Sequence, residues 1–362
     1  MNKMKITIVG GGNIGTQFAV HCAEKSNDVV VYTSKPEIFS KHLNIVDEDG
    51  KTTHEGKIAF ATSDPELAFR NADLIMVTMP STMMKSIAEV IYAHTGWESM
   101  IGVVPGNGGS ECAFRKCIDR GNVFFGIERV PAIARLVKKG KTVKSTGYRE
   151  ELHVSSLPIA NAEKCAEMIS DIFDMPCKVI PSFLNLTMTP SNPILHTTRL
   201  RTLFGDWKPG ITYNTVPLFY EEWDDSSSEL LISCDEEVQE ICRALPVFQL
   251  DYVKSLRAHY DSPTVEAMTR KISSIQAFKG LTTPTVKVEG GLIPDLHSRY
   301  FTADFSYGLT IIKQVADFAG VSTPNSDATM NWYNGIAIEK DEFRFADFGI
   351  TDRVAFEKFY LR

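Results

Sequence analysis

Residues 6–15, ITIVGGGNIG, decide the fold that we predict for this chain. The apolar and β-branched run Ile6–Val9 predicts a buried strand, which leads directly into a glycine-rich turn with the spacing G-x-G-x-x-G. A helical pattern follows over 14–25. A strand, a glycine-rich turn and a helix in this order are typical of the first unit of a dinucleotide-binding domain.

The residues of this turn each meet a requirement of a bound pyrophosphate. Gly10 permits the tight turn, Gly12 lets the backbone approach the phosphates, and Gly15 lets the helix and the strand pack closely. The N–H groups at the start of the helix, around Asn13 and Ile14, face the phosphate charge. All five residues are therefore predicted to bind the cofactor.

The alternation of strands and helices continues to about residue 180. Apolar runs bounded by turn residues predict further buried strands at 29–32, 74–78, 101–104, 123–127 and 177–180. Helical patterns are found at 81–94, 111–119 and 161–173. The stretch 142–157 alternates polar and apolar residues, which predicts an antiparallel or mixed extension of the sheet. The pattern as a whole predicts an α/β fold with a Rossmann-like, doubly wound parallel sheet.

After Phe183 the alternation stops, and the remaining pattern is helical with irregular connections. We expect these helices at 192–204, 227–244, 250–260, 263–278, 307–319, 325–336 and 352–361. With 362 residues the chain is long enough for two domains. We predict a dinucleotide-binding Rossmann domain over 1–183 and an all-helical substrate and catalytic domain over 184–362.

Composition excludes several classes of partner. Lysine and arginine number 38 against 45 aspartate and glutamate residues, and this acidic balance argues against nucleic acid or an anionic membrane, because binding there needs clustered cations. The seven cysteines are scattered without metal-ligand spacing, so we expect reduced thiols and no metal. No apolar stretch reaches the about 18 residues of a membrane span, and the N-terminus lacks the features of a signal peptide. The expected location is the cytoplasm.

The end of the second predicted strand bears on the choice of cofactor. An Asp or Glu about 20 residues after the glycines would bind the ribose 2′-hydroxyl of NAD. This chain has Thr33, Ser34 and Lys35 there instead. Two hydroxyl groups and a cation suit a 2′-phosphate, so NADP(H) is favoured and NAD(H) stays open as the alternative.

Two further loops follow strand ends, where ligands of open α/β sheets collect. Met79 and Pro80 follow the strand at 74–78 and are predicted to contact the cofactor, and residues 105–109, PGNGG, follow the next strand. We expect the amides of the second loop and the Asn107 side chain near the nicotinamide and the substrate. A turn in which the glycines serve only to adopt positive φ is the other interpretation.

Among the eight histidines, His196 has the most distinctive context. It ends the segment 189–196, TPSNPILH, a proline-broken helix start just after the predicted domain junction, where a cleft is expected. Asn192 lies four residues earlier, so both side chains point to one face of a helix. His196 could then move a proton while Asn192 binds a substrate oxygen. His297 is the alternative acid or base.

The segment 297–309 brings an arginine and an aspartate together just before another helix. An aspartate such as Asp304, if bonded to a histidine Nδ1, would fix the imidazole tautomer and make it a better general acid. Arg299 offers a planar fork for a carboxylate or a pyrophosphate. From composition alone, a helix-capping aspartate and a surface arginine are the other interpretation.

Together these segments resemble the opine dehydrogenase family, the octopine/nopaline type of NAD(P)-dependent enzyme. The resemblance covers nearly the whole chain, and its motifs fall in the family's order and spacing. They are the fingerprint at 10–15, VPGNGGSECAFRK at 104–116, GIERVPAIAR at 126–135, SNPILH at 191–196 and SRYFTADFSYGL at 298–309.

The resemblance implies both a reaction and roles for named residues. Such enzymes condense an amino acid with a 2-oxo acid to an imine, which a hydride from the nicotinamide reduces to a secondary-amine dicarboxylate. His196 would be the proton-transfer residue and Asp304 its partner. Arg299 would contact bound ligand, either a substrate carboxylate or the cofactor pyrophosphate.

Two other interpretations of the sequence are a different reductase and a non-catalytic cofactor-binding protein. A ketopantoate reductase or a 6-phosphogluconate-type dehydrogenase has a similar first domain, but these usually employ a catalytic lysine, and no lysine lies between Asn185 and Arg201. A non-catalytic NADPH-binding sensor would lack the proton donor. The stretch Tyr220–Ser228 follows no pattern that we can assign to a substrate. The sequence leaves the two substrates and the oligomeric state open, with a homodimer among the assemblies it allows.

Overall fold

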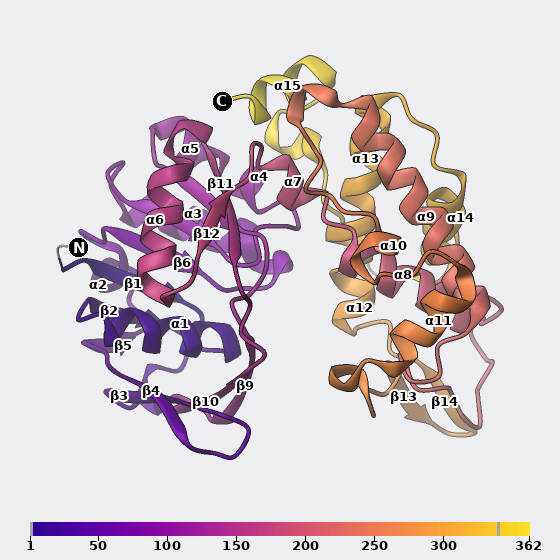
Figure 1. Ribbon diagram of the computed structural model, residues 1–362, viewed down its shortest axis with the longest axis horizontal. Coiled ribbons are helices and arrows are strands. Elements are labelled where there is room, and N and C mark those ends of the chain that lie inside the picture. The colour runs from indigo at the N-terminus through magenta and orange to yellow at the C-terminus, as the bar shows by residue number, and fades with distance from the viewer. Residues whose placement is uncertain (1–2, 339–340) are drawn as a thin grey trace. The chain divides into compact units, whose positions relative to one another are not determined.

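In the computed structural model, which describes residues 3–338 and 341–362, the largest sheet has eight strands in the order β12-β11-β8-β7-β6-β1-β2-β5. These strands are β1 (Lys5–Val9), β2 (Asp28–Tyr32), β5 (Phe60–Thr62), β6 (Leu74–Val77), β7 (Met100–Val103), β8 (Phe124–Ile127), β11 (Leu152–Leu157) and β12 (Cys177–Val179). All neighbours pair in parallel except β8 and β11. The strand order reverses at β1 (Figure 1), so the predicted Rossmann-like, doubly wound fold is confirmed.

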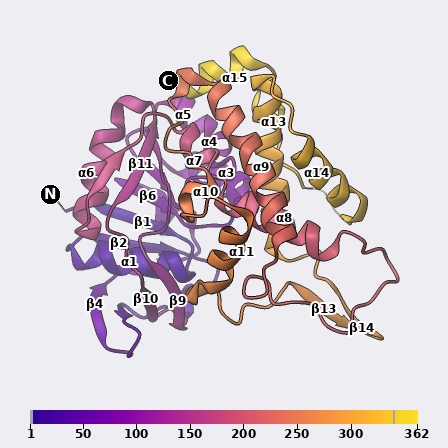
Figure 2. The same ribbon diagram turned by 45° about the vertical axis from the view of Figure 1, so that its right-hand side comes forward.

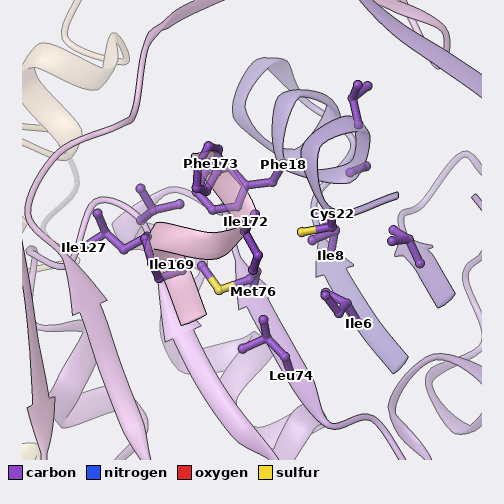
Figure 3. Close-up of a cluster of buried hydrophobic side chains, with 14 of the residues drawn as sticks. Ile6, Ile8, Phe18, Cys22, Leu74, Met76, Ile127, Ile169, Ile172 and Phe173 are labelled. Atoms are coloured by element: carbon purple, nitrogen blue, oxygen red, sulfur yellow. The ribbon is translucent and has the colours of Figure 1, made fainter. Parts of the chain in front are cut away.

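Helices connect the strands and supply part of the core. They are α1 (Asn13–Glu24), α2 (Pro65–Phe69), α3 (Met84–His94), α4 (Ser110–Ala113), α5 (Arg115–Arg120) and α6 (Ala162–Phe173). Phe18 of α1 meets Phe173 of α6 edge to face, with ring centroids 4.7 Å apart. Figure 3 shows both rings in one cluster with the strand residues Ile8 and Met76. This packing holds α1 against the sheet.

A second sheet was not predicted. It has four strands in the order β4-β3-β10-β9, namely β3 (His42–Val46), β4 (Thr52–Lys57), β9 (Ile133–Lys138) and β10 (Thr142–Thr146). The predicted extension at 142–157 is split, because β10 joins this sheet and β11 joins the large one. Gly147 separates the two strands with a φ of 61°, a left-handed turn that favours glycine.

The chain divides into two compact units. The first is Met1–Leu186 together with Lys358–Arg362, and the second is Thr187–Glu357. The division falls three residues after the predicted boundary at residue 183 and assigns the last five residues to the first unit. Those residues are held there by side-chain contacts, since the Tyr360 hydroxyl donates to Glu111 and Arg362 forms an ion pair with Asp119.

The second unit is built around α9 (Asp225–Ala244), which packs against α8 (Ser191–Phe204), α11 (Val265–Ser274), α13 (Thr310–Ala319) and α14 (Pro324–Ile336). Shorter helices of this unit are α10 (Leu256–His259), α12 (Arg299–Thr302) and the π-helical turn η6 (Phe305–Leu309). The helices α7 (Leu184–Thr187) and α15 (Arg353–Tyr360) each include residues of both units. The predicted helical character of this half is confirmed.

Two details of the helical prediction are wrong. The stretch 250–260 holds only the short helix α10, because residues 251–253 form a turn and a bend. The buried Val253 and Leu256 lie three residues apart, which is the apolar spacing that predicted a longer helix. The half is also not all-helical, since β13 (Thr285–Val288) and β14 (Gly291–Pro294) form an antiparallel hairpin, visible in Figure 2. Gly290 and Gly291, with φ of 90° and 143°, supply its turn.

Candidate active site

His196 is buried in α8, with 2% of its surface exposed, and both ring nitrogens have a partner. Nδ1 lies 2.7 Å from Oδ2 of Asp304, and Nε2 lies 2.7 Å from the hydroxyl of Tyr220. Asp304 is brought there by close packing of η6 on α8. At Gly308 an added Cβ would lie only 3.0 Å from Pro193, so glycine permits this approach.

Aromatic rings surround the imidazole. The Tyr300 ring is nearly perpendicular to it, with centroids 4.5 Å apart, and Phe219 stacks on Tyr300 at 4.9 Å. Tyr220 itself stacks on Phe278 at 4.2 Å. Burial holds the pKa of Tyr220 well above its usual value, so the phenol stays protonated and can donate a hydrogen bond.

This geometry fixes what the imidazole can do. A carboxylate can only accept, so Nδ1 carries the hydrogen that bonds to Asp304. Nε2 is then the nitrogen that gains and loses a proton, and in the neutral ring it accepts from the Tyr220 hydroxyl. A histidine oriented by a carboxylate in this way is equipped for general acid–base catalysis.

The other predicted residues of this unit lie on exposed positions. Asn192 is exposed one turn before His196 on α8. Arg299 is exposed at the start of α12, with its guanidinium 5.5 Å from the centroid of Tyr300, the ring that also touches His196. His297 is exposed too, and its backbone N–H is bonded to Asp295.

In the first unit, the glycine-rich turn has the shape that a pyrophosphate needs. Gly10 has a φ of 106°, and an added Cβ there would lie 2.8 Å from Oγ1 of Thr78. At Gly15 the added atom would lie 1.8 Å from the carbonyl oxygen of Gly10. At Gly12, by contrast, nothing lies within 4 Å, so space is open where a phosphate would approach the backbone. These residues fit a dinucleotide.

Two residues of the fingerprint have structural contacts. The Asn13 side chain accepts a hydrogen bond of 2.8 Å from the backbone N–H of Leu136, which ties the start of α1 to β9. Ile14 packs against the hydrophobic core. A contribution from either residue to a phosphate would therefore come through the backbone N–H.

A pocket of about 430 Å³ lies at the carboxyl ends of β1, β2 and β6. Its lining includes Gly10, Thr33, Ser34 and Met79 from the predicted cofactor set, and also Met83. Pro80 and Lys35 are outside the lining and exposed. Within the ranges 3–338 and 341–362, Lys35 forms no ion pair, so its charge is available to a ligand.

The loop after β7 has two consecutive glycines of positive φ, Gly108 at 67° and Gly109 at 72°. Asn107 precedes them and is partly exposed. The buried Glu111 follows, and its carboxylate accepts from the Tyr360 hydroxyl. The turn geometry explains the glycines, and the Asn107 side chain stays a predicted ligand contact.

One group of side chains outside these sites has metal-ligand character. Among the described residues, His21, Glu24 and His54 have ligand atoms within 4.8 Å of one another. Hydrogen bonds already engage them, from His54 to Glu24 and between His21 and Tyr148. Sequence spacing missed this group because α1 and β4 meet only in the fold. Over all the residues that the structure describes, none of the helices is both long and apolar enough to span a membrane.

Sequence reasoning missed three residues beside His196. Tyr220 and Phe219 come from the segment 217–223, PLFYEEW, and Arg199 lies three residues after His196. A signal was present, because a run of aromatic residues next to acidic ones is unusual on a solvated loop. Nothing in the sequence indicates that this loop returns to α8.

The chain matches known proteins over both units. Residues 179–337 match the family described as NAD/NADP octopine/nopaline dehydrogenase, alpha-helical domain, and residues 5–105 match the NAD-dependent glycerol-3-phosphate dehydrogenase N-terminus. Opine dehydrogenase of Haliotis discus hannai is 26% identical over 390 residues, covering 96% of this chain and 95% of the relative. Octopine dehydrogenase of Pecten maximus is 25% identical over 359 residues, covering 91% and 89%.

The fold has a solved counterpart. A structure of octopine dehydrogenase with NADH and L-arginine aligns with a TM-score of 0.85 at 22% sequence identity, covering 98% of both chains.

Proposed function

Because this chain belongs to the opine dehydrogenase family, an NAD(P)-dependent group of oxidoreductases acting on CH–NH bonds, we propose that His196 is the general acid/base of its reaction. The reaction is the reductive condensation of an amino acid with a 2-oxo acid. The observation that carries the proposal is the 2.7 Å contact between Nδ1 of His196 and Asp304, which leaves Nε2 to handle the proton.

We propose further roles in charge stabilisation and ligand binding for the other predicted residues. Asp304 fixes the tautomer and stabilises the positive charge that the ring acquires when it takes up a proton. Arg299, exposed and adjacent to Tyr300, binds a substrate carboxylate or the cofactor pyrophosphate. Asn192 and Asn107 bind substrate oxygens through their amides. The bound nicotinamide supplies the hydride.

We assign the cofactor to the glycine-rich turn and to the pocket beyond it. Gly10, Gly12 and Gly15 admit the pyrophosphate, and the backbone N–H groups at the start of α1 bind it. Octopine dehydrogenase has been solved with NADH. In this chain Thr33 and Ser34, which line the pocket, and the exposed Lys35 favour NADPH, because they offer two hydroxyl groups and a positive charge to a 2′-phosphate.

We expect the enzyme to work in the cytoplasm. Its seven cysteines are all free, and five of them are buried. A reducing compartment keeps such thiols from forming disulfides. Its partners are small molecules, the amino acid and the 2-oxo acid.

The test is cofactor oxidation, followed by nicotinamide absorbance. NADPH or NADH is mixed with a panel of 2-oxo acids, first alone and then with amino acids. We expect oxidation only when both substrates are present, and a loss of about 100-fold or more in kcat for His196→Gln. Oxidation by a 2-oxo acid alone would indicate a ketopantoate-type reductase, and cofactor binding without turnover would indicate a sensor.

A further inference from the structure

Arg199 is a fully buried arginine whose every donor group is occupied. Its side chain is 0% exposed and lies on α8 three residues after His196. Nε donates to the carbonyl of Phe219, Nη2 donates to the carbonyls of Leu218 and Glu222, and Nη1 donates to Asp224 and to Ser227. A guanidinium presents five such donors in a fixed plane. Arg199 therefore holds the segment 218–224 at several points at once.

The segment that Arg199 holds is the one that carries Tyr220. The carbonyls on either side of this tyrosine, those of Phe219 and Glu222, accept from the guanidinium at 3.0 and 2.6 Å. The segment also closes on itself, because the backbone N–H of Leu218 donates to the carboxylate of Glu222 at 2.6 Å. The buried Tyr220 side chain is left with little freedom, and its hydroxyl lies 2.7 Å from Nε2 of His196.

We propose that Tyr220 is a positioning residue for His196 and that Arg199 is the clamp that keeps Tyr220 in place. The inference rests on the proposed function, in which His196 moves the proton. Asp304, His196 and Tyr220 then form one hydrogen-bonded chain, with a partner at each ring nitrogen. The same helix, α8, carries both the histidine and the clamp, so the loop cannot shift without disturbing the imidazole.

A phenol suits this place because it can serve both states of the ring. Its O–H donates to Nε2 when the imidazole is neutral, and its oxygen accepts from Nε2–H when the ring is charged. Burial keeps the pKa of Tyr220 well above its usual value, so the phenol remains available for both roles. The titratable groups that face it are His196, Asp304, Tyr300 and Tyr260.

The direction in which loss of the Tyr220 hydroxyl shifts the pH–rate profile can be predicted. A hydrogen bond to a charged partner is stronger than one to a neutral partner. Tyr220→Phe therefore disfavours the charged imidazole more than the neutral one. We expect the limb of the pH–rate profile that belongs to His196 to move to lower pH by about one unit, with kcat about tenfold lower and KM for both substrates little changed.

The experiment compares Tyr220→Phe with Arg199→Lys and gives each of the two variants a control. Arg199→Lys keeps the charge but cannot make five hydrogen bonds, and we expect it to reproduce the pH shift. Tyr213→Phe and Arg257→Lys are matched controls, because neither residue contacts His196. If Arg199→Lys fails to fold, Ser227→Ala, which removes one partner of the guanidinium, takes its place.

Nuclear magnetic resonance of ¹⁵N-labelled histidine gives a reading that needs no turnover. In both the unaltered protein and Tyr220→Phe we expect neutral His196 with its hydrogen on Nδ1, because Asp304 still accepts from that nitrogen. In Tyr220→Phe the ¹⁵N signal of Nε2 should shift, because this nitrogen has lost the hydroxyl that donates to it. Unchanged ¹⁵N signals and an unchanged pH profile in Tyr220→Phe would overturn the inference, provided that His196→Gln is inactive. Full activity of His196→Gln would instead overturn the proposed function, whatever Tyr220 does.

Discussion

The imidazole Nδ1 of His196 lies 2.7 Å from a carboxylate oxygen of Asp304, although 108 residues separate them in the chain. The contact depends on two features of the second unit. The helix α8 carries the histidine, and the π-helical turn η6 follows the aspartate directly. The side chains are 3% and 15% exposed, so the carboxylate acts on the ring with little screening by water.

Asp304→Asn tests this relationship. An amide has no charge with which to stabilise the protonated ring, and it can hold the wrong tautomer, so we expect kcat to fall about 100-fold. The folded state should persist, because the substitution preserves shape. His297→Gln is the control and should keep most of the activity, since His297 is exposed. Nearly full activity in Asp304→Asn together with a large loss in His297→Gln would contradict the assignment and would indicate His297 as the acid or base.

Local patterns explain why much of the molecule could be predicted from sequence. The apolar runs that form β1, β2, β6, β7 and β8 are largely buried in the sheet, so nearly all their residues are apolar. Turn residues mark the ends of each run. The fingerprint and the helix start at 191–196 are contiguous in sequence. The pairing of His196 with Asp304 was expected only through the family resemblance, because no local rule links positions so far apart.

What could not be predicted depends on packing or on exposed strands. β4 has the sequence TTHEGK, largely polar and exposed, and it carries no apolar alternation that would mark a strand. Tyr220 and Arg199 become part of the site because the segment 218–224 returns to α8, a tertiary contact that spacing does not encode. The docking of Tyr360 on Glu111 is another contact of this kind.

Two glycines of the fingerprint should respond differently to alanine. In Gly12→Ala the added Cβ meets nothing within 4 Å, and Gly12 has an ordinary φ of −84°, so we expect an unchanged melting temperature. The methyl group would occupy the space predicted for the pyrophosphate, and cofactor affinity should fall about tenfold or more. In Gly15→Ala the Cβ would lie 1.8 Å from a backbone oxygen, so folding itself should fail. Thermal denaturation and cofactor titration separate the two effects; tight cofactor binding by Gly12→Ala would contradict the assignment.

Lys35→Ala should change the preference between the two cofactors. The exposed ammonium follows the end of β2 and has no ion-pair partner within the described ranges, so its charge is free for a 2′-phosphate. We expect kcat/KM for NADPH to fall about tenfold and that for NADH to change less than about twofold. Lys41→Ala, another exposed lysine of the first unit, is the matched control. Equal losses of kcat/KM with both cofactors would show that Lys35 does not bind the 2′-phosphate.

Asp235 should make stability depend on pH. It lies in α9 with 2% of its surface exposed, and Oδ2 accepts a hydrogen bond of 2.7 Å from the backbone N–H of Leu256. Burial raises the pKa of this carboxyl to about 7. The folded state therefore binds the proton more tightly than the unfolded chain does, and the stabilisation is complete below about pH 4 and lost as the pH rises to about 7.

Asp235→Asn removes this dependence while it keeps the shape and an oxygen for Leu256. The variant should resemble the unaltered protein in free energy of unfolding near pH 4, and it should be more stable at pH 8, by about 4 kcal/mol at most. Other groups titrate over the same range, so the quantity to measure is the difference between the two proteins, from urea unfolding at several pH values. A difference that does not change between pH 4 and pH 8 would show that Asp235 is ionised in the folded state throughout. Because α9 packs against α8, loss of this stabilisation at high pH should also lower the temperature at which the site of His196 is lost.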